Sequence, residues 1–219
     1  MSVTRAVVAV TAAGLVLASC GTDDGGTSDD PSASSSPSPT STVSVPASVA
    51  LSEPGSNLSF GATASVIFEP TQKRGSVIDL TVKKVTKGSV KDFSAFILDD
   101  FTKAATPYYV NVRVRNLGEG EVGGTPVPLW GVDSANTLLP AATFTTTFRK
   151  CPSEPLPKTF ASGDTLNTCL VFLAPEGGTL KAVSFRPDQD FNPIQWTGDI
   201  ATPKAVPTKT KKTKKSNQR

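Results

Sequence analysis

The alternation of side chains between residues 108 and 115 constrains the fold of this chain more than any other feature. In Tyr-Tyr-Val-Asn-Val-Arg-Val-Arg the even positions are Tyr or Val, and the later odd positions are Asn or Arg. A period of two places one set of side chains on each face of a strand, so this segment is predicted to be a half-buried β-strand. Residues 76–85 repeat the pattern until Lys83-Lys84 shifts its phase, which indicates a bulge or a strand end.

Other segments carry the same strand signals and are separated by turn clusters rich in Gly, Pro, Asp and Glu. Further strands are predicted at residues 62–68, 128–132, 143–150, 168–173, 181–186 and 194–196. The pattern predicts one short helical segment, residues 90–98, ending at Asp99-Asp100. Seven or more short strands joined by turns predict an all-β, immunoglobulin-like antiparallel β-sandwich with disordered N- and C-terminal tails.

The N-terminus carries the features of an export signal. Arg5 precedes an apolar run at residues 6–17, which is too short to span a bilayer, and Leu17-Ala18-Ser19-Cys20 follows. These four residues resemble the lipobox of bacterial lipoproteins. The resemblance implies that residues 1–19 are a signal peptide and that Cys20 carries acyl chains such as palmitate, which anchor the protein at the outer face of the cytoplasmic membrane. The alternative is a plain secretory signal followed by an accidental cysteine.

Composition sets the limits of the folded domain. Residues 20–59 are dominated by Gly, Ser, Thr, Pro and Asp, which bury too little apolar surface to offset the entropy of ordering. We therefore predict a disordered tether over residues 20–59, a sandwich domain over 60–200 and a basic disordered tail over 201–219. The Ser/Thr/Pro mixture of the tether is also typical of O-glycosylated stalks.

The C-terminal tail carries the positive charge of the chain. From Lys204 onward it holds seven basic residues and no acid, and without them the formal charge falls from +3 to −4. The residues predicted to contact an anionic membrane or an anionic envelope polymer are Lys209, Lys211, Lys212, Lys214 and Lys215. The alternative is a solvated end with no partner. Nucleic acid is not predicted as a partner, because a terminal basic run on an exported protein does not favour it.

Cysteine usage predicts one disulfide. With Cys20 assigned to lipid, Cys151 and Cys169 remain as an even pair in an oxidising compartment. A thioredoxin-like redox pair would need Cys-x-x-Cys spacing, which the chain lacks. We therefore interpret Cys151–Cys169 as a structural disulfide.

The order of several short motifs is similar to that of the telokin-like, immunoglobulin-like domains of actinobacterial secreted proteins and lipoproteins. The motifs are the segment 109–118, Leu129-Trp130-Gly131, Phe148-Arg149-Lys150-Cys151, Phe160-x-x-Gly163 and the segment 169–175. The resemblance implies an immunoglobulin-like sandwich over about residues 60–198, and it brings no catalytic or binding residues with it. Trp130 precedes both cysteines, so the Cys…Trp…Cys order of antibody domains is not met.

The absence of histidine from the sequence excludes several chemistries. Ser-His-Asp and Cys-His nucleophile systems need an imidazole, and zinc sites of the Cys/His type need it too. Carboxylates at Asp99-Asp100, Glu119-x-Glu121 and Asp188-x-Asp190 are candidate Ca²⁺ ligands or, alternatively, solvated turn residues. No cofactor and no catalytic residue is predicted.

These observations favour a non-enzymatic, lipid-anchored binding or interaction module of the cell envelope, whose ligand and protein partner the sequence does not name. The Gly-rich loop 118–125 and the Pro-rich loop 152–157 are the predicted binding loops. Trp196 is predicted to pack in the core or over a sheet edge, the alternative being a stacking platform for a sugar or peptide. The alternative function is an envelope enzyme, or an accessory subunit of one, acting on cell-wall polysaccharide.

Overall fold

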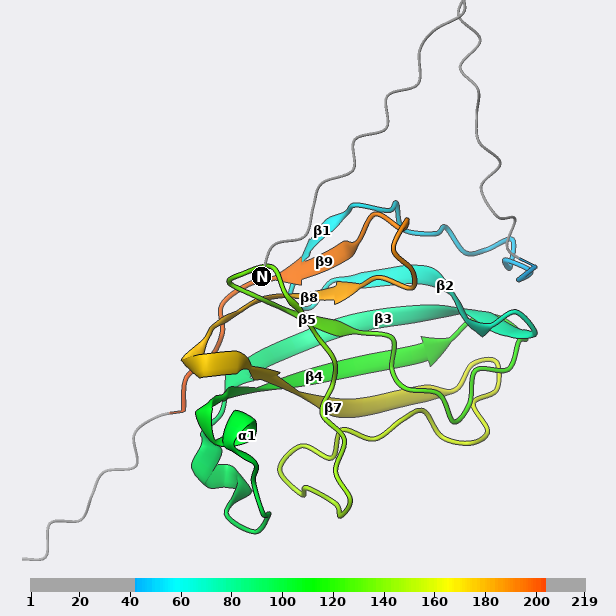
Figure 1. Ribbon diagram of the computed structural model, residues 1–219. Helices are drawn as coiled ribbons and strands as arrows, with labels where there is room; N and C mark the ends of the chain where they lie inside the picture. The colour runs from blue at the N-terminus through cyan, green and yellow to red at the C-terminus, as the bar shows by residue number, and fades with distance from the viewer. Residues whose placement is uncertain (1–41, 204–219) are drawn as a thin grey trace, which may run out of the picture. The chain divides into compact units, whose positions relative to one another are not determined.

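A computed structural model describes residues 42–203, which form a sandwich of two β-sheets (Figure 1). Its elements are β1 (Asn57–Ser59), β2 (Thr63–Thr71), β3 (Arg74–Lys87), the 3-10 helix η1 (Val90–Phe93), α1 (Asp100–Ala104), β4 (Thr106–Asn116), β5 (Trp130–Asp133), β6 (Leu138–Leu139), β7 (Thr165–Ala174), the 3-10 turn η2 (Pro175–Gly177), β8 (Leu180–Phe185) and β9 (Ile194–Thr197). One sheet has the strand order β1-β9-β8-β5-β6 and the other β2-β3-β4-β7. All pairings between these strands are antiparallel except β1 with β9, so the predicted all-β sandwich is confirmed.

The alternation that predicted the central strands is the alternation between core and solvent. Ile78, Leu80 and Val82 of β3 are fully buried between the sheets, and the last two stand opposite Val114 and Val112 of β4. The register of β3 against β4 shifts between Val82 and Lys84, which confirms the predicted bulge. The extra residue keeps Val85 on the core side after two lysines in succession.

Large side chains from both sheets fill the space between the layers. Trp196 has no exposed surface, and its indole Nε1 donates to the carbonyl oxygen of Ala62 at 2.9 Å. Tyr108, Phe172 and Phe185 are buried in the same cluster. Trp196 therefore belongs to the core, and the stacking platform considered as its alternative is wrong.

Two predicted elements differ from the structure. Residues 143–150 are a loop rather than a strand, because Phe144 and Phe148 pack on Phe93 instead of aligning the backbone with a neighbouring strand. The predicted helix over 90–98 is limited to η1, and Asp99 begins α1 instead of ending a helix. Its carboxylate accepts from the backbone N–H of Thr102 at 2.7 Å, the usual role of Asp at an N-cap.

The folded domain begins earlier than predicted, since part of the predicted tether belongs to it. Residues 57–59 form β1, and Ser52 N donates to Ser65 O at 2.8 Å along the edge of β2. Pairing of this kind uses the backbone, so a segment poor in apolar side chains can still join a sheet. Cys20, the predicted signal peptide and the five lysines of the basic tail lie outside the described residues.

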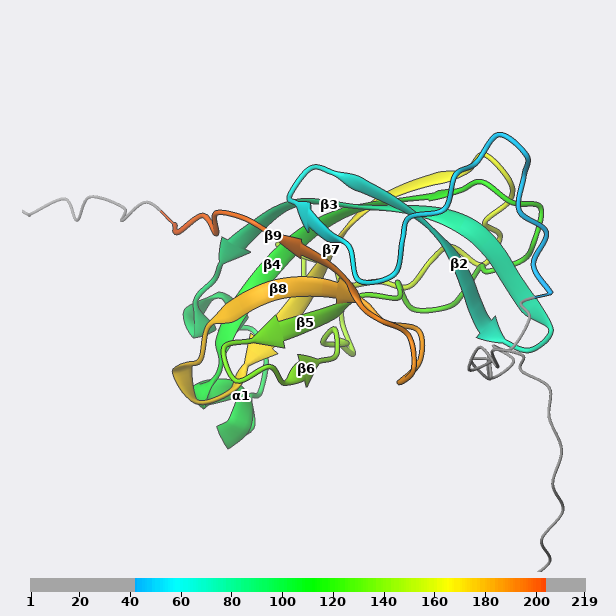
Figure 2. The ribbon, with the colours of Figure 1, turned by 90° about the horizontal axis from the view of Figure 1, so that it is seen from above.

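The two ends of the described chain lie at opposite ends of β3 (Figures 1 and 2). Thr42 contacts Glu69 next to the β2–β3 turn, whereas Ala201 bridges to Thr86 near the other end of the strand. At ~3.3 Å per residue, the 14 residues of β3 separate the two exits by about 40 Å. Among residues 42–203, no helix is long and apolar enough to cross a membrane.

Candidate ligand-binding face

The two predicted binding loops are bonded to each other rather than free. The backbone N–H of Gly124 donates to the carbonyl oxygens of Leu156 and Pro157 at 3.1 and 2.9 Å, and Leu156 N donates to Thr125 O at 2.9 Å. The Arg74 guanidinium also donates to the carbonyl oxygen of Gly123 at 2.6 Å. These contacts hold loop 118–125 as part of the scaffold and place loop 152–157 beside the outer face of the four-stranded sheet.

A disulfide attaches the chain segment 142–153 to strand β7. Cys151 and Cys169 are bonded, with their Cα atoms 5.0 Å apart, as predicted. On either side of this bond, Ala142 N donates to Val171 O at 2.7 Å and Ser153 N donates to Cys169 O at 2.8 Å. The segment therefore occupies the edge of β7, which would otherwise offer unpaired backbone groups to another strand.

Beneath this segment lies an aromatic cluster on the outer side of β4 and β7. Phe93, Phe96, Phe144 and Phe148 have ring centroids 4.8 to 6.4 Å apart. Tyr109 joins them, with its ring centroid 5.9 Å from that of Phe148. This cluster forms a second small core outside the sandwich, so η1 and the segment 142–153 cover one part of the sheet.

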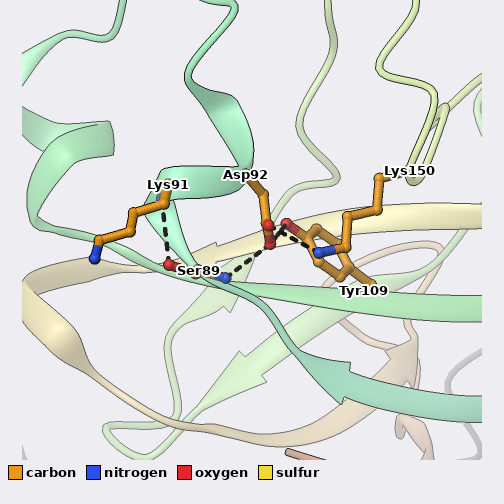
Figure 3. Close-up of polar contacts among 5 residues, drawn as sticks. All are labelled: Ser89, Lys91, Asp92, Tyr109 and Lys150. Carbon is orange, nitrogen blue, oxygen red and sulfur yellow. Dashed lines mark hydrogen bonds and ion pairs between the residues drawn. The ribbon is translucent and has the colours of Figure 1, made fainter. Parts of the chain in front are cut away.

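Asp92 ties η1 to β4 and to the loop that carries Cys151 (Figure 3). Its carboxylate accepts from the Tyr109 hydroxyl and lies within 2.8 Å of the Lys150 ammonium, and it also accepts from the Ser89 backbone at 3.1 Å. The Lys150 ammonium lies 5.3 Å from the centroid of the Tyr109 ring, within range of a cation–π attraction. Each of the four groups finds a hydrogen-bond or ion-pair partner within the set. We call Ser89, Asp92, Tyr109 and Lys150 the clasp, because together they fasten η1 and the loop before Cys151 to β4.

The protonation of this network follows from its contacts. Partial burial alone raises the pKa of Asp92, but the hydrogen bonds from Lys150, Tyr109 and the Ser89 backbone outweigh it and hold the pKa below the ordinary 3.8. Burial of the phenol, together with its bond to the Asp92 carboxylate, raises the pKa of Tyr109 above its ordinary value. At neutral pH the clasp therefore contains the carboxylate form of Asp92 and the protonated phenol of Tyr109.

Beyond the clasp, the outer face of the same sheet is polar. Two cross-strand rows on it are Thr63–Thr81–Arg113–Asn167 and Ser65–Asp79–Arg115–Thr165. Neither row contains an aromatic or aliphatic side chain. We call these rows, together with Lys83, Lys84 and Asn111, the polar face.

The charge of the polar face is predominantly positive and unpaired. Arg113, Arg115, Lys83 and Lys84 are exposed, and in the described part of the chain none of them forms an ion pair. The carboxylate of Asp79 accepts from the Ser65 hydroxyl at 2.6 Å. Residues two apart on a strand lie about 7 Å apart, so Arg113 and Arg115 begin a stripe of cations that continues past Asn111 to Lys84 on β3.

A recess of about 900 Å³ lies where the polar face meets the Pro-rich loop. Its sheet side includes Lys83, Lys84, Asn111 and Asn167, and its far wall is formed by Pro152, Glu154, Pro155 and Pro157. Loop 152–157 thus borders a recess, as expected of a binding loop, but the charged side chains come mainly from the sheet. The sequence contained this signal, because the lysines and arginines occupy the outward positions of both strands.

Two of the three acidic pairs considered as Ca²⁺ ligands, Asp99-Asp100 and Asp188-x-Asp190, bond to their own turns. Asp99 caps α1, Asp100 forms an ion pair with Lys103 at 2.8 Å, and Asp188 Oδ1 accepts from the backbone of Asp190 at 2.9 Å. Within residues 42–203, no cluster of three or more potential metal ligands is present.

No family model, curated protein or solved structure matches this chain. The candidate site therefore rests on its own geometry, and the resemblance to telokin-like domains stays an expectation.

The sequence analysis missed one further surface, which surrounds Trp130. This side chain is 36% exposed at the start of β5, in contrast to buried Trp196. It lines an apolar groove of about 430 Å³ at one end of the sandwich. The spacing Pro126-x-Pro128-x-Trp130 was the available signal, since prolines on both sides of a strand start restrict how deeply it can be buried.

Proposed function

We propose that this protein is a lipid-anchored module of the cell envelope that binds linear anionic polymers on its polar face. The observation that carries the proposal is the stripe of four exposed cations, without ion-pair partners among the described residues, beside two cross-strand rows that contain no aromatic side chain. Lipid attachment at Cys20 would place the module at the outer face of the cytoplasmic membrane.

The geometry of the stripe supports a linear polymer. Arg113 and Arg115 lie about 7 Å apart on β4, and Lys84 stands beside Asn111, the next outward position of that strand. An elongated row of cations suits a chain with repeated anionic groups, such as phosphodiesters or uronates. The Thr, Ser and Asn side chains beside the cations can exchange hydrogen bonds with the hydroxyls of such a polymer. Single-stranded nucleic acid is disfavoured, because these rows offer no aromatic ring on which a base could stack.

The exit points of the chain favour a polymer over the membrane as the partner of the basic tail. Ala201 bonds to the backbone of Val85 and Lys87, so the tail begins beside the lysines of β3. The chain leading back to Cys20 leaves from the other end of the same strand. Since the tail leaves the domain near the lysines of β3, the tail and the stripe can bind one polymer together.

The alternative function, an enzyme acting on wall polysaccharide, would need two carboxylates in one cleft. The recess beside the polar face contains Glu154 as its carboxylate, and the groove around Trp130 contains none. These surfaces therefore give the enzymatic alternative no support.

The polymer-binding proposal is tested with a paired substitution and its control. Arg113→Gln with Arg115→Gln removes two charges from the stripe, whereas Arg149→Gln with Lys181→Gln removes two exposed charges elsewhere. Binding to poly(glycerol phosphate) and to a polyuronate is measured by titration over a range of salt concentrations. At ~1 kcal/mol per cation, the stripe variant should bind about thirty-fold more weakly, with a salt slope smaller by about two.

The control pair should retain most of the affinity, since its charges lie off the polar face. Equal losses in both variants would mean attraction by net charge alone and would contradict a specific site. Tighter binding to anionic phospholipid vesicles or to single-stranded DNA than to both polymers would assign the face to a different partner.

Anchoring is tested separately. Cys20→Ser should release the protein from membranes into the medium, because it removes the thiol that receives the lipid. Fractionation followed by mass spectrometry of the N-terminal peptide measures this. A Cys20→Ser variant still extracted only by detergent would contradict lipidation and would leave the polymer-binding result unaffected.

A further inference from the structure

The outer face of the five-stranded sheet carries a cross-strand row that belongs neither to the polar face nor to the clasp. The strand register places Trp130 of β5 opposite Ser184 of β8 and Ser184 opposite Gln195 of β9. Gln195 in turn pairs with Asn57 of β1. Figure 2 looks onto this sheet, in which β9, β8 and β5 lie side by side. We call these four residues the Trp130 row.

The Trp130 row points away from the core. Val183 and Phe185 of β8 belong to the buried cluster between the sheets, so Ser184 between them points to the outer side. Directly paired residues of neighbouring strands share a face, and the other three members therefore point outward as well. At ~4.8 Å between neighbouring strands, the row spans about 14 Å from Trp130 to Asn57. It is long enough to contact a short polymer rather than a single small molecule.

The row combines one exposed aromatic ring with uncharged polar groups. The Trp130 side chain is 36% exposed, and no other aromatic ring packs against it within residues 42–203. The remaining side chains are a hydroxyl and two primary amides, which can both donate and accept hydrogen bonds. A neutral ligand is therefore favoured here, in contrast to the polyanion proposed for the polar face.

Ser184 gives an independent indication of a ligand. Its side chain has no exposed surface, and its hydroxyl has no hydrogen-bond partner among the described residues. A buried, unpaired hydroxyl is unfavourable and uncommon in folded proteins, so it calls for a physical reason. Its direct neighbours on this face are the exposed Trp130 and the partly exposed Gln195, and a ligand laid along the row brings hydrogen-bonding groups to this position.

A saccharide fits this combination better than a peptide does. A pyranose ring presents C–H groups on its face, which pack on an indole, and hydroxyls around its edge, which both donate and accept. A peptide that binds a sheet uses the unpaired backbone groups of an edge strand. The strands β5, β8 and β9 are each paired on both sides, so only their side chains are available to a ligand.

We propose that the Trp130 row binds a neutral hexopyranose chain. One sugar ring stacks on Trp130, and the amides of Gln195 and Asn57 bond to hydroxyls farther along the chain. The Gln195 side chain turns toward the sugar, so that a sugar hydroxyl reaches the Oγ of Ser184. This site lies on a different sheet from the polar face, and its test does not depend on the binding of anionic polymers there.

The stacking is tested by calorimetric titration with chitohexaose and cellohexaose, which are both uncharged. Trp130→Ala should weaken binding at least ten-fold, comparable to the loss of a base stacked on an aromatic ring. Phe101→Ala is the matched control, because Phe101 is another exposed aromatic residue, 56% exposed, but lies in α1 outside this sheet. It should leave the affinity unchanged. Equal losses in the two variants, or no binding of either saccharide to the unaltered protein, would overturn the proposal.

Ser184→Ala separates a binding role from a structural one. It should weaken saccharide binding about five-fold, as expected for one hydrogen bond, while the melting temperature of the free protein does not fall, because the removed hydroxyl is unpaired. Gln195→Ala should weaken binding to a similar extent. Unchanged affinity in both variants would overturn the row as the binding site, even if Trp130→Ala weakened binding.

Tryptophan fluorescence locates the bound saccharide without any substitution. Trp196 is buried in the core, so a change in emission on adding chitohexaose reports on Trp130. Binding should shift the emission to shorter wavelength and lower its quenching by acrylamide. Calorimetric binding without any change in emission would overturn the proposal. So would loss of saccharide binding in Arg113→Gln with Arg115→Gln, because it would place the saccharide on the polar face.

Discussion

The Tyr109 hydroxyl donates to Asp92 Oδ2 at 2.8 Å, joining the 3-10 helix η1 to the central strand β4. Because Lys150 binds the other oxygen of the same carboxylate, this bond also holds the loop that enters Cys151. One carboxylate therefore connects the covering segments of the second core to the sheet beneath them.

Acid should weaken this connection. The pKa of Asp92 is lower in the folded than in the unfolded chain, so its stabilising contribution is present above the ordinary value of 3.8 and is lost as pH falls below it. Asp92→Asn should lower the free energy of unfolding by about 1–2 kcal/mol at neutral pH, a range that allows for solvent screening of the half-exposed Lys150. Urea denaturation at a series of pH values measures the difference, which should shrink below about pH 4. A difference independent of pH would contradict this assignment.

Alkali should act on the other member of the bond. The raised pKa of Tyr109 keeps the folded phenol protonated while the unfolded one ionises near pH 10, so stability falls as pH rises above that value. Tyr109→Phe should remove this loss of stability above pH 10. Below pH 4 it should change the pH dependence of the free energy of unfolding less than Asp92→Asn does. The same denaturation series, extended to pH 11, compares the two variants.

Loss of the disulfide should destabilise the domain and expose an edge. Cys151→Ser with Cys169→Ser should cost about 3 kcal/mol, as expected for a loop of 18 residues, measured by urea denaturation. It should also loosen the segment that bonds to Val171 and Cys169, leaving the β7 edge open to other strands. Faster growth of thioflavin-positive aggregates at partial unfolding is expected. Equal aggregation of both proteins at matched stability would show that the edge stays covered.

Gly120 is expected to tolerate no side chain. A Cβ at this position would lie 1.7 Å from the carbonyl oxygen of Gly75, so Gly120→Ala requires the loop to move away from the start of β3. Gly124→Ala is the control, because its Cβ meets nothing within 4 Å and its cost, about 1 kcal/mol, comes from the positive φ of 73° alone. In thermal unfolding, the melting temperature of Gly120→Ala should lie well below that of Gly124→Ala. The reverse order would mean that this loop is not held against β3.

Deletion of residues 204–219 should lower polymer affinity more than either substitution pair, since it removes seven basic residues rather than two. The slope of log affinity against log salt should decrease, because fewer counterions are released on binding. Titration with poly(glycerol phosphate) and with anionic vesicles measures both quantities. An unchanged salt profile for both would leave the tail without a role in binding.

The central strands show which features a local sequence pattern can predict and which it cannot. The alternation in β4 predicted which residues face the core, and the phase shift at Lys83-Lys84 predicted the bulge, because both depend on the geometry of a single strand. The same pattern placed Arg113 and Arg115 outward. It did not show that they stand beside Lys84, because cross-strand neighbours depend on register over a pairing of residues far apart in the chain.

Local patterns were least informative where tertiary contacts compete with them. Residues 143–150 have strand-like composition, yet packing of Phe144 and Phe148 on Phe93 outweighs sheet pairing. The two tryptophans were also indistinguishable by type, although Trp196 is fully buried and Trp130 is not. The exposure of a large side chain depends on which chain segments cover it. For both tryptophans these segments are distant in the sequence.

The sequence alone determined the all-β class, the pairing of Cys151 with Cys169 and the outward direction of the basic side chains. These follow from the two-residue period of the strands, the number of cysteines and the positions of the charged residues, all of which can be read from the chain itself. Tertiary structure alone decided that the cations form one stripe, that a groove opens at Trp130 and that the two ends of the domain leave from opposite ends of β3. These relationships join residues dozens of positions apart, and only the packing of the two sheets brings them together.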